Sequence, residues 1–229
     1  MYRFVAVLAV FLLAHVIPAL PASRRALQAR LGEGGFIGAY SLLSLLLFAW
    51  LIREVLLAPY IPIWFAGPWS FWFAIVLTPL ALVLLGVGAL APNPLSIAFV
   101  TRPFRPDAPG AVAITRHPIL WGLGLWGCAH LPANGHLAGL ILFGSLGVFA
   151  LIGIGVVEGR RQELLGTARW QELAGATSYL PFVAILRGRA RWPLDRVSLI
   201  GAAVGLLLTV LLLAGGHLWL FGRDPLGFL

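Results

Sequence analysis

The chain has 229 residues, of which 60% are hydrophobic and only 10% are charged, which is too little polar surface for a water-soluble protein. Its net charge of +8 comes from sixteen arginines and no lysine. These arginines gather between apolar runs, which indicates orientation in a membrane and argues against nucleic-acid binding. The single cysteine, Cys128, excludes an internal disulfide. The composition therefore predicts an integral membrane protein whose first partner is the lipid bilayer.

Six apolar runs approach the length of about 17–25 residues that a transmembrane helix needs. In chain order they are Phe4–Leu20, Phe36–Leu57, Phe71–Leu90, Ile119–Leu131, Leu137–Val157 and Val197–Phe221. The fourth run is short and needs its flanks to cross a bilayer. We expect an all-α, polytopic bundle of about six spans that forms a single domain over residues 1–229.

The arginines alternate between the connecting segments. They follow the first span, precede the fourth, and recur between the fifth and sixth, as Arg24, Arg25 and Arg30, then Arg102, Arg105 and Arg116, then Arg160 through Arg196. The positive-inside rule makes these three segments cytoplasmic and puts both termini on the outer side of the membrane. A cleaved signal peptide is an alternative for the first run, but its removal would break the parity of six spans.

Glycines are frequent within the predicted spans, among them Gly86, Gly122, Gly127 and Gly205. A glycine lets two helices approach closely, which is how spans pack in lipid. Glycines around a large flat ligand would equally leave room for that ligand. The sequence leaves both interpretations open.

Ionisable side chains inside a span are costly and therefore mark candidate functional residues. His15 lies in the first run, and His130 lies in the fourth, thirteen residues after His117. Thirteen residues of helix extend about 20 Å, so His117 and His130 cannot bind one metal ion together. One histidine facing another from a different span is the usual way in which a bundle holds haem. The plain alternative is that each span histidine only donates a hydrogen bond to a neighbouring helix. If haem is bound, His117 is a rival to His130 as the second ligand beside His15.

The tract after the fifth span places charged residues at near-helical spacing beside a stripe of Leu164, Leu165 and Trp170. This pattern predicts a cytoplasmic interfacial helix over about residues 158–175. A basic helix on anionic lipid explains most of it. Glu158, however, enters at the membrane edge, close in topology to Arg116 and His117.

Several motifs resemble the NnrU family. They are His15, Leu31-Gly32-Glu33, Tyr40-Ser41-Leu42, Pro92-Asn93-Pro94, Thr115 to Pro118 with Trp121-Gly122, and His130 to Gly135. The resemblance implies a bacterial membrane protein tied to denitrification and nitrogen-oxide metabolism, related more distantly to 15-cis-zeta-carotene isomerase. Its membrane would then be the bacterial inner membrane, with the outer termini in the periplasm. The isomerase holds haem b through span histidines, which implies His15 and His130 as axial ligands and a lipophilic small molecule as substrate. Cys128 is a conceivable alternative ligand.

A second resemblance is to isoprenylcysteine carboxyl methyltransferases. Its motif residues are Arg116-His117-Pro118 with Gly122, then Glu158, Leu164, Gly166, Trp170 and Pro181. In that family these positions enclose S-adenosylmethionine at the cytoplasmic face. The aromatic residue after the proline is displaced here to Trp121, and the family's paired glutamate is Glu158-Gly159. We interpret this as a shared fold in which the methyl-donor site is lost or altered.

Three hypotheses remain, which differ in what the protein binds. The first is haem b, held by His15 and His130, with Arg116, His117 and Glu158 shaping a cytoplasmic pocket. The second is S-adenosylmethionine in that pocket. The third is a non-catalytic membrane partner in which the polar residues only hold helices together. The sequence decides neither whether the protein is an enzyme nor whether it forms oligomers.

Overall fold

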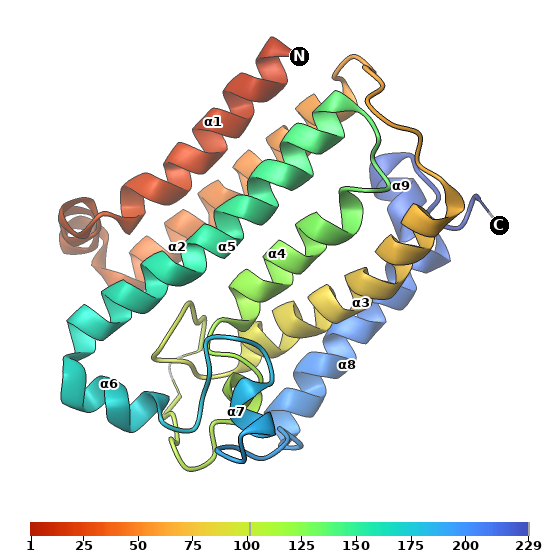
Figure 1. Cartoon of the computed structure of the whole chain (residues 1–229). Coiled ribbons are helices and arrows are strands. Elements are labelled where there is room, and N and C mark those ends of the chain that lie inside the picture. The colour runs from red at the N-terminus through yellow and green to blue at the C-terminus, as the bar shows by residue number, and fades with distance from the viewer. Residues whose placement is uncertain (101, 229) are drawn as a thin grey trace. The chain divides into compact units, whose positions relative to one another are not determined.

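The computed structural model describes residues 1–100 and 102–228, and its regular elements are all helical apart from an isolated β-bridge between Pro62 and His136. In chain order (Figure 1) the helices are α1 (Tyr2–Val16), α2 (Pro21–Leu56), α3 (Pro68–Leu90), α4 (Pro118–His130), α5 (Leu137–Leu165), α6 (Thr167–Ala174), α7 (Val183–Leu186), α8 (Arg196–Leu211) and α9 (His217–Phe221). Three short helical turns are η1 (Ile17–Ala19), η2 (Gly110–Ala113) and η3 (Leu212–Gly216). The predicted all-α class is confirmed.

Four helical stretches are long and apolar enough to cross a membrane. They are Ala22–Leu56, Pro68–Leu90, Leu137–Leu165 and Arg196–Phe221. The chain is therefore an integral membrane protein. The other two predicted spans fall on α1, with 15 residues, and α4, with 13 residues. Both are shorter than the usual span, so the count of six and the periplasmic termini stay predictions.

Helix α2 begins much earlier than the predicted span Phe36–Leu57. It starts at Pro21, a residue type that suits a first helical turn, and it carries Arg24, Arg25 and Arg30 on helical backbone instead of in a loop. Gly32 interrupts it with φ 69° and ψ 170°. The prediction missed this segment because hydropathy reports immersion in lipid, whereas a charged sequence can be helical outside it.

The chain divides into two compact units. Unit 1 comprises residues 1–63 and 136–142, and unit 2 comprises residues 64–135 and 143–229. In unit 1, α1 packs against α2, and Phe4, Val7, Leu8 and Phe11 are its buried side chains. The single domain over residues 1–229 stays a prediction.

In unit 2, α3 packs against both α4 and α8. The contact with α8 depends on glycine: a Cβ atom at Gly205 would lie 2.5 Å from the carbonyl oxygen of Leu82, and one at Gly201 would lie 2.6 Å from the Cα of Val87. A Cβ at Gly127 of α4 would likewise lie 2.8 Å from the carbonyl oxygen of Phe143 in α5. At these positions the glycines serve close helix packing, which was one of the two interpretations left open by the sequence.

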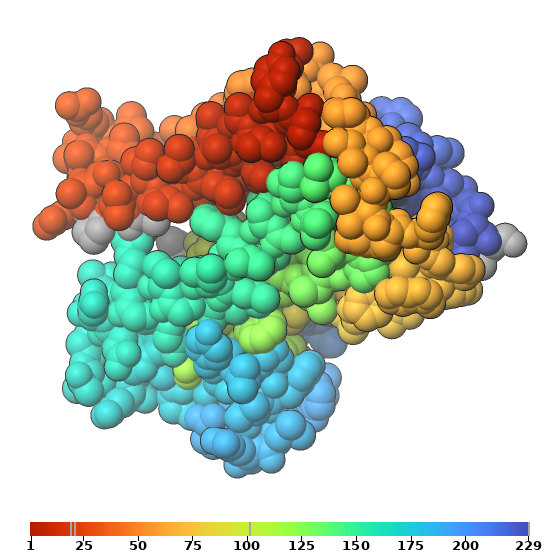
Figure 2. Space-filling view, turned by 45° about the horizontal axis from the view of Figure 1, so that its top comes forward, coloured from red at the N-terminus to blue at the C-terminus, as the bar shows by residue number. Residues whose placement is uncertain are grey.

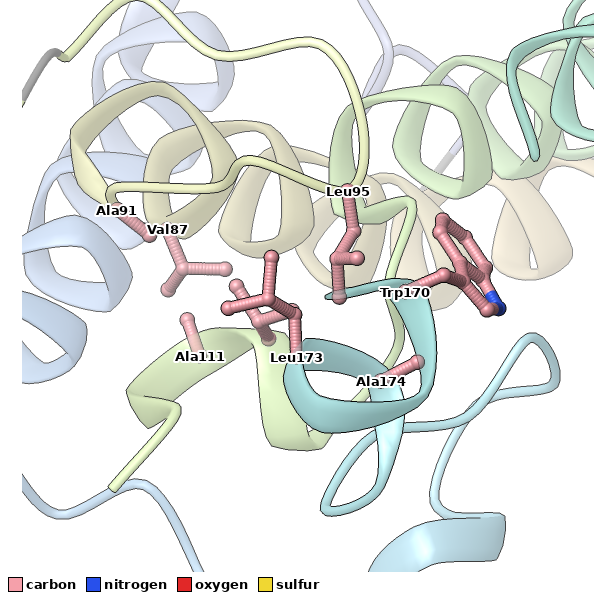
Figure 3. Close-up of a cluster of buried hydrophobic side chains, with 8 residues drawn as sticks. Val87, Ala91, Leu95, Ala111, Trp170, Leu173 and Ala174 are labelled. Carbon is pink, nitrogen blue, oxygen red and sulfur yellow. The ribbon is translucent and has the colours of Figure 1, made fainter. Parts of the chain in front are cut away.

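At one end of unit 2 the connecting segments form a small apolar core of their own. Its buried residues, here called the Leu95 cluster, are Val87, Ala91, Leu95, Ala111, Val112, Trp170, Leu173 and Ala174. Figure 3 shows Leu95 and Leu173 pointing into it from the segment after α3 and from α6. The stretch between α5 and α8 forms a contiguous surface, teal to light blue in Figure 2.

The tract predicted as one interfacial helix over residues 158–175 comprises the end of α5 and the whole of α6. Gly166 separates the two helices with φ 73°, a conformation that suits glycine because it has no Cβ. Within this tract Trp170 belongs to the Leu95 cluster and Leu165 packs against it, whereas Leu164 is 75% exposed. The break at Gly166 thus turns α6 onto this small core.

Candidate functional site

Arg116 and His117 lie directly before α4, on backbone that two other segments hold in place. The backbone N–H of Arg116 donates to the carbonyl of Ser178 at 2.8 Å. The side-chain amide of Asn93 donates to the carbonyl of Arg116 at 2.8 Å, while its own oxygen accepts from the backbone N–H of Leu95 at 3.0 Å. Asn93, 4% exposed, therefore fixes the segment after α3 to the start of α4.

Glu158 reaches this position from α5 and accepts from both residues. Nη2 and Nε of Arg116 lie 2.5 Å and 3.2 Å from its two carboxylate oxygens, which is the parallel arrangement typical of strong arginine–carboxylate pairs. Nε2 of His117 lies 2.5 Å from Oε2. The side chains of Arg116 and Glu158 are only 14% and 18% exposed. The structure thus brings together the three residues Arg116, His117 and Glu158.

His117 continues the network to Ser96. The imidazole is fully buried, and its Nδ1 lies 2.8 Å from the hydroxyl oxygen of Ser96. Serine, histidine and glutamate in a row resemble a hydrolase triad in composition. Ser96 is 1% exposed, however, so no substrate can reach its hydroxyl group in this arrangement. The row therefore holds the carboxylate of Glu158 in place and does not form a nucleophilic site.

Arg116 has two further neighbours from the tract around α6. Its Nη1 donates to the hydroxyl of Thr177 at 3.4 Å, and its guanidinium lies over the ring of Trp170, 5.4 Å from the centroid. Thr177 in turn donates to the carbonyl of Ala174 at 2.9 Å. We call Ser96, Arg116, His117, Glu158, Trp170 and Thr177 the Glu158 cluster. It joins four segments at one end of unit 2.

The Glu158 cluster is internally satisfied. Both oxygens of Glu158 accept from its neighbours, and among the described residues no buried side-chain nitrogen or oxygen lacks a partner. A carboxylate in this state binds a ligand only by exchanging one of its present bonds. The arrangement therefore suits a structural contact that joins segments better than an open binding site for ribose hydroxyls.

His15 and His130 belong to different units, and each has the same local geometry. Nδ1 of His15 lies 2.7 Å from the carbonyl oxygen of Phe11, one turn earlier. Nδ1 of His130 lies 2.9 Å from the carbonyl oxygen of Trp126, also one turn earlier. Because a carbonyl oxygen only accepts, Nδ1 carries the hydrogen in both rings. In the neutral form of His130, Nε2 then has the lone pair that a metal ion would use.

Aromatic rings surround both histidines. His130 lies parallel to Phe143 at a centroid distance of 5.0 Å and contacts Trp126 at 5.1 Å. His15 contacts Phe11 at 4.3 Å and Tyr40 at 5.7 Å. A fixed tautomer in apolar surroundings is what a haem ligand needs. Within the described part of the chain no group of three metal-ligating side chains occurs, and an axial haem site does not need one.

Sequence reasoning missed one buried acid in unit 1. Glu54 of α2 is 4% exposed, and it accepts from Arg53 at 2.7 Å and from the indole N–H of Trp50 at 3.3 Å. Arg3 of α1 lies 3.8 Å away. A carboxylate inside the predicted span Phe36–Leu57 was the available signal, because charged side chains in spans rarely occur without a partner.

Comparison with known proteins identifies one family. The profile described as NnrU protein matches residues 3–225. No curated protein and no solved structure matches the chain.

Proposed function

Because the chain belongs to the NnrU family over nearly its whole length, we propose that it is a haem b-binding membrane protein of nitrogen-oxide metabolism, located in the bacterial inner membrane. His130 and His15 are the proposed axial ligands. The observation that carries this proposal is the shared geometry of the two rings: each Nδ1 donates to the carbonyl of the preceding turn, at 2.9 Å and 2.7 Å. Haem would supply a redox-active iron.

The chain's own residues have separable tasks in this proposal. Trp126 and Phe11 accept from the Nδ1 atoms and so hold both rings in one tautomer. The rings of Phe143 and Tyr40 shield the histidines from water. The Glu158 cluster keeps α4 in register with α5, which positions His130 at the other end of α4. An isomerase-like reaction on a lipophilic substrate belongs to the same proposal.

Spectra of the detergent-purified protein test haem binding. We expect a Soret band that shifts on dithionite reduction and about one haem b per chain by pyridine haemochrome. His130→Ala and His15→Ala should abolish or shift the band, and His136→Ala should leave it unchanged. Added imidazole should restore the band of His130→Ala, which a variant that merely unfolds would not show. Unchanged spectra in both variants would contradict the assignment.

S-adenosylmethionine binding is the second candidate. It is favoured by one observation: Arg116 and Glu158, 42 residues apart and both part of the methyltransferase motif, lie in contact. Because the two side chains bind each other, a ligand carboxylate and ribose would have to replace that pair. Calorimetry tests this. Arg116→Ala and Glu158→Ala should weaken binding, and a parent protein that takes up no ligand at about millimolar concentration removes the candidate.

The satisfied hydrogen bonds of the Glu158 cluster also support the third hypothesis, a membrane partner without catalysis. In that case the cluster only joins α4, α5 and the connecting segments. A colourless protein that binds neither haem nor S-adenosylmethionine, even after expression with a haem precursor, would favour it.

A further inference from the structure

A surface pocket of about 310 Å³ lies at the end of unit 2 that contains the Leu95 cluster. Its walls come from the segment after α3 and from the end of α5 with α6. The lining includes Asn93, Arg102, Phe104, Leu165, Arg169 and Leu173. We propose that this pocket binds the phosphate headgroup of an anionic phospholipid, with Arg102 and Arg169 holding the phosphate.

The two arginines provide the charge that a phosphate needs. Arg102 is exposed, and among the described residues it makes no ion pair. Arg169 contacts both carboxylate oxygens of Glu172 at 2.6 Å, but these two side chains are 55% and 56% exposed. Such a surface pair contributes little stability, so a phosphate can replace it. Guanidinium groups match phosphate oxygens by parallel hydrogen bonds.

Apart from Asn93 and the two arginines, the lining is apolar. Phe104 and Leu165 pack against the Leu95 cluster, and Leu173 belongs to it. Figure 3 shows Leu173 on α6 and Leu95 after α3 among the side chains of that cluster. A pocket lined by two cations and by hydrocarbon fits an amphiphile, whose phosphate and first acyl carbons need both kinds of surface. A free inorganic anion would leave the apolar walls unused.

The pocket also lies near the ends of two candidate spans. Asn93 follows the end of α3 at Leu90 by three residues, and Leu165 is the last residue of α5. Both helices are candidate spans. Phosphates lie where spans end, and basic pockets between spans are known binding places for anionic headgroups. This proposal is independent of haem, since neither His15 nor His130 lines the pocket.

Binding of dioleoylphosphatidylglycerol to the delipidated full chain in a neutral detergent tests the proposal, with native mass spectrometry to count bound lipids. Dioleoylphosphatidylcholine, which has the same acyl chains and no net charge, is the matched lipid. We expect saturable binding of the anionic lipid, weakened about tenfold by Arg102→Gln and by Arg169→Gln. Glu172→Gln should strengthen it, because it releases Arg169.

Arg105→Gln is the matched control. Arg105 lies in the same segment as Arg102 and is exposed, but it pairs with Asp107 at 2.7 Å and does not line the pocket. It should leave lipid binding unchanged, and all four variants should unfold at the temperature of the parent. If Arg102→Gln and Arg169→Gln bind the anionic lipid as tightly as the parent protein does, the proposal is overturned. Inorganic phosphate that displaces the lipid at equal concentration would overturn the lipid assignment and indicate a free anion.

Discussion

Glu158 stabilises unit 2 because it is the common acceptor for two donors from the start of α4. Replacing it with glutamine removes the charge but keeps the shape, and it leaves Arg116, only 14% exposed, without its ion-pair partner. We expect Glu158→Gln to lower the free energy of unfolding by about 2 kcal/mol. Thermal unfolding in detergent measures the change.

The control for this substitution lies on the same helix. Glu163 of α5 is exposed, so Glu163→Gln should change stability by less than about 0.5 kcal/mol. The double variant Arg116→Gln with Glu158→Gln should lose less than the sum of the single variants, since each already breaks the shared pair. Strict additivity would show that the contact contributes nothing.

The sequence predicted part of this arrangement. Arg116, His117 and Glu158 could be placed together because an arginine-rich segment and the end of an apolar run meet at the same membrane face. Ser96 and Thr177 could not, because single hydroxyl residues in connecting segments follow no periodicity. Glu54 was not predicted, although the rule that charged residues in spans have partners would have identified it.

Helix α8 begins with a side-chain cap that depends on pH. Asp195 accepts from the backbone N–H groups of Val197 at 3.1 Å and Ser198 at 3.0 Å, and the Ser198 hydroxyl donates to it at 2.6 Å. Partial burial alone would raise the pKa of Asp195, but these hydrogen bonds outweigh it and hold the pKa below its usual value. The charged form is therefore the one that caps the helix.

This sets the sign of the pH dependence. Since the pKa is lower in the folded protein, the stabilisation is complete above the unfolded value and disappears as the pH falls through the folded one. Asp195→Ala should cost about 1 kcal/mol near neutral pH and nothing once the carboxyl group is protonated in both states. Asp195→Asn keeps an acceptor and should cost less. Unfolding curves between about pH 6 and about pH 3 distinguish the three proteins.

The contact between α3 and α8 requires glycine at position 205. An alanine there would bring its Cβ within 2.5 Å of the Leu82 backbone, so the helices would have to separate. We expect Gly205→Ala to destabilise the protein by about 1–3 kcal/mol in thermal unfolding. At Gly155 of α5 a Cβ meets nothing within 4 Å, so Gly155→Ala should be neutral or slightly stabilising. Similar losses at both positions would refute close packing as the role of Gly205.

Element boundaries were predictable only where hydrophobicity defines them. The predicted span Phe71–Leu90 lies within α3, and Val197–Phe221 coincides nearly with α8 through α9. The start of α2 at Pro21 and the break at Gly166 were not predicted. Both depend on backbone conformation in polar sequence, about which the apolar pattern gives no information.

For the whole molecule, the open question is whether α4 crosses the bilayer. Its 13 helical residues extend about 20 Å, against about 35 Å for the 23 residues of α3. Yet hydrogen bonds join the two ends of residues 116–135 to the segments that flank opposite ends of α3. Asn93, after α3, holds the carbonyl of Arg116, while Trp64, before α3, donates its backbone N–H to the carbonyl of Gly135 at 3.0 Å and its indole N–H to that of Pro132 at 2.9 Å.

We therefore expect residues 116–135 to cross the bilayer beside α3, with α4 at the centre and non-helical ends. The single native cysteine allows a clean test: on a Cys128→Ser background, Ala108→Cys reports on the segment before α4, Ala133→Cys on the segment after it, and Phe65→Cys on the segment before α3. We expect a membrane-impermeant maleimide to label positions 65 and 133 in intact cells and position 108 only after lysis, since the arginine-rich segment should be cytoplasmic. Labelling of positions 108 and 133 from the same side would show that α4 does not cross and that the prediction of six spans is wrong.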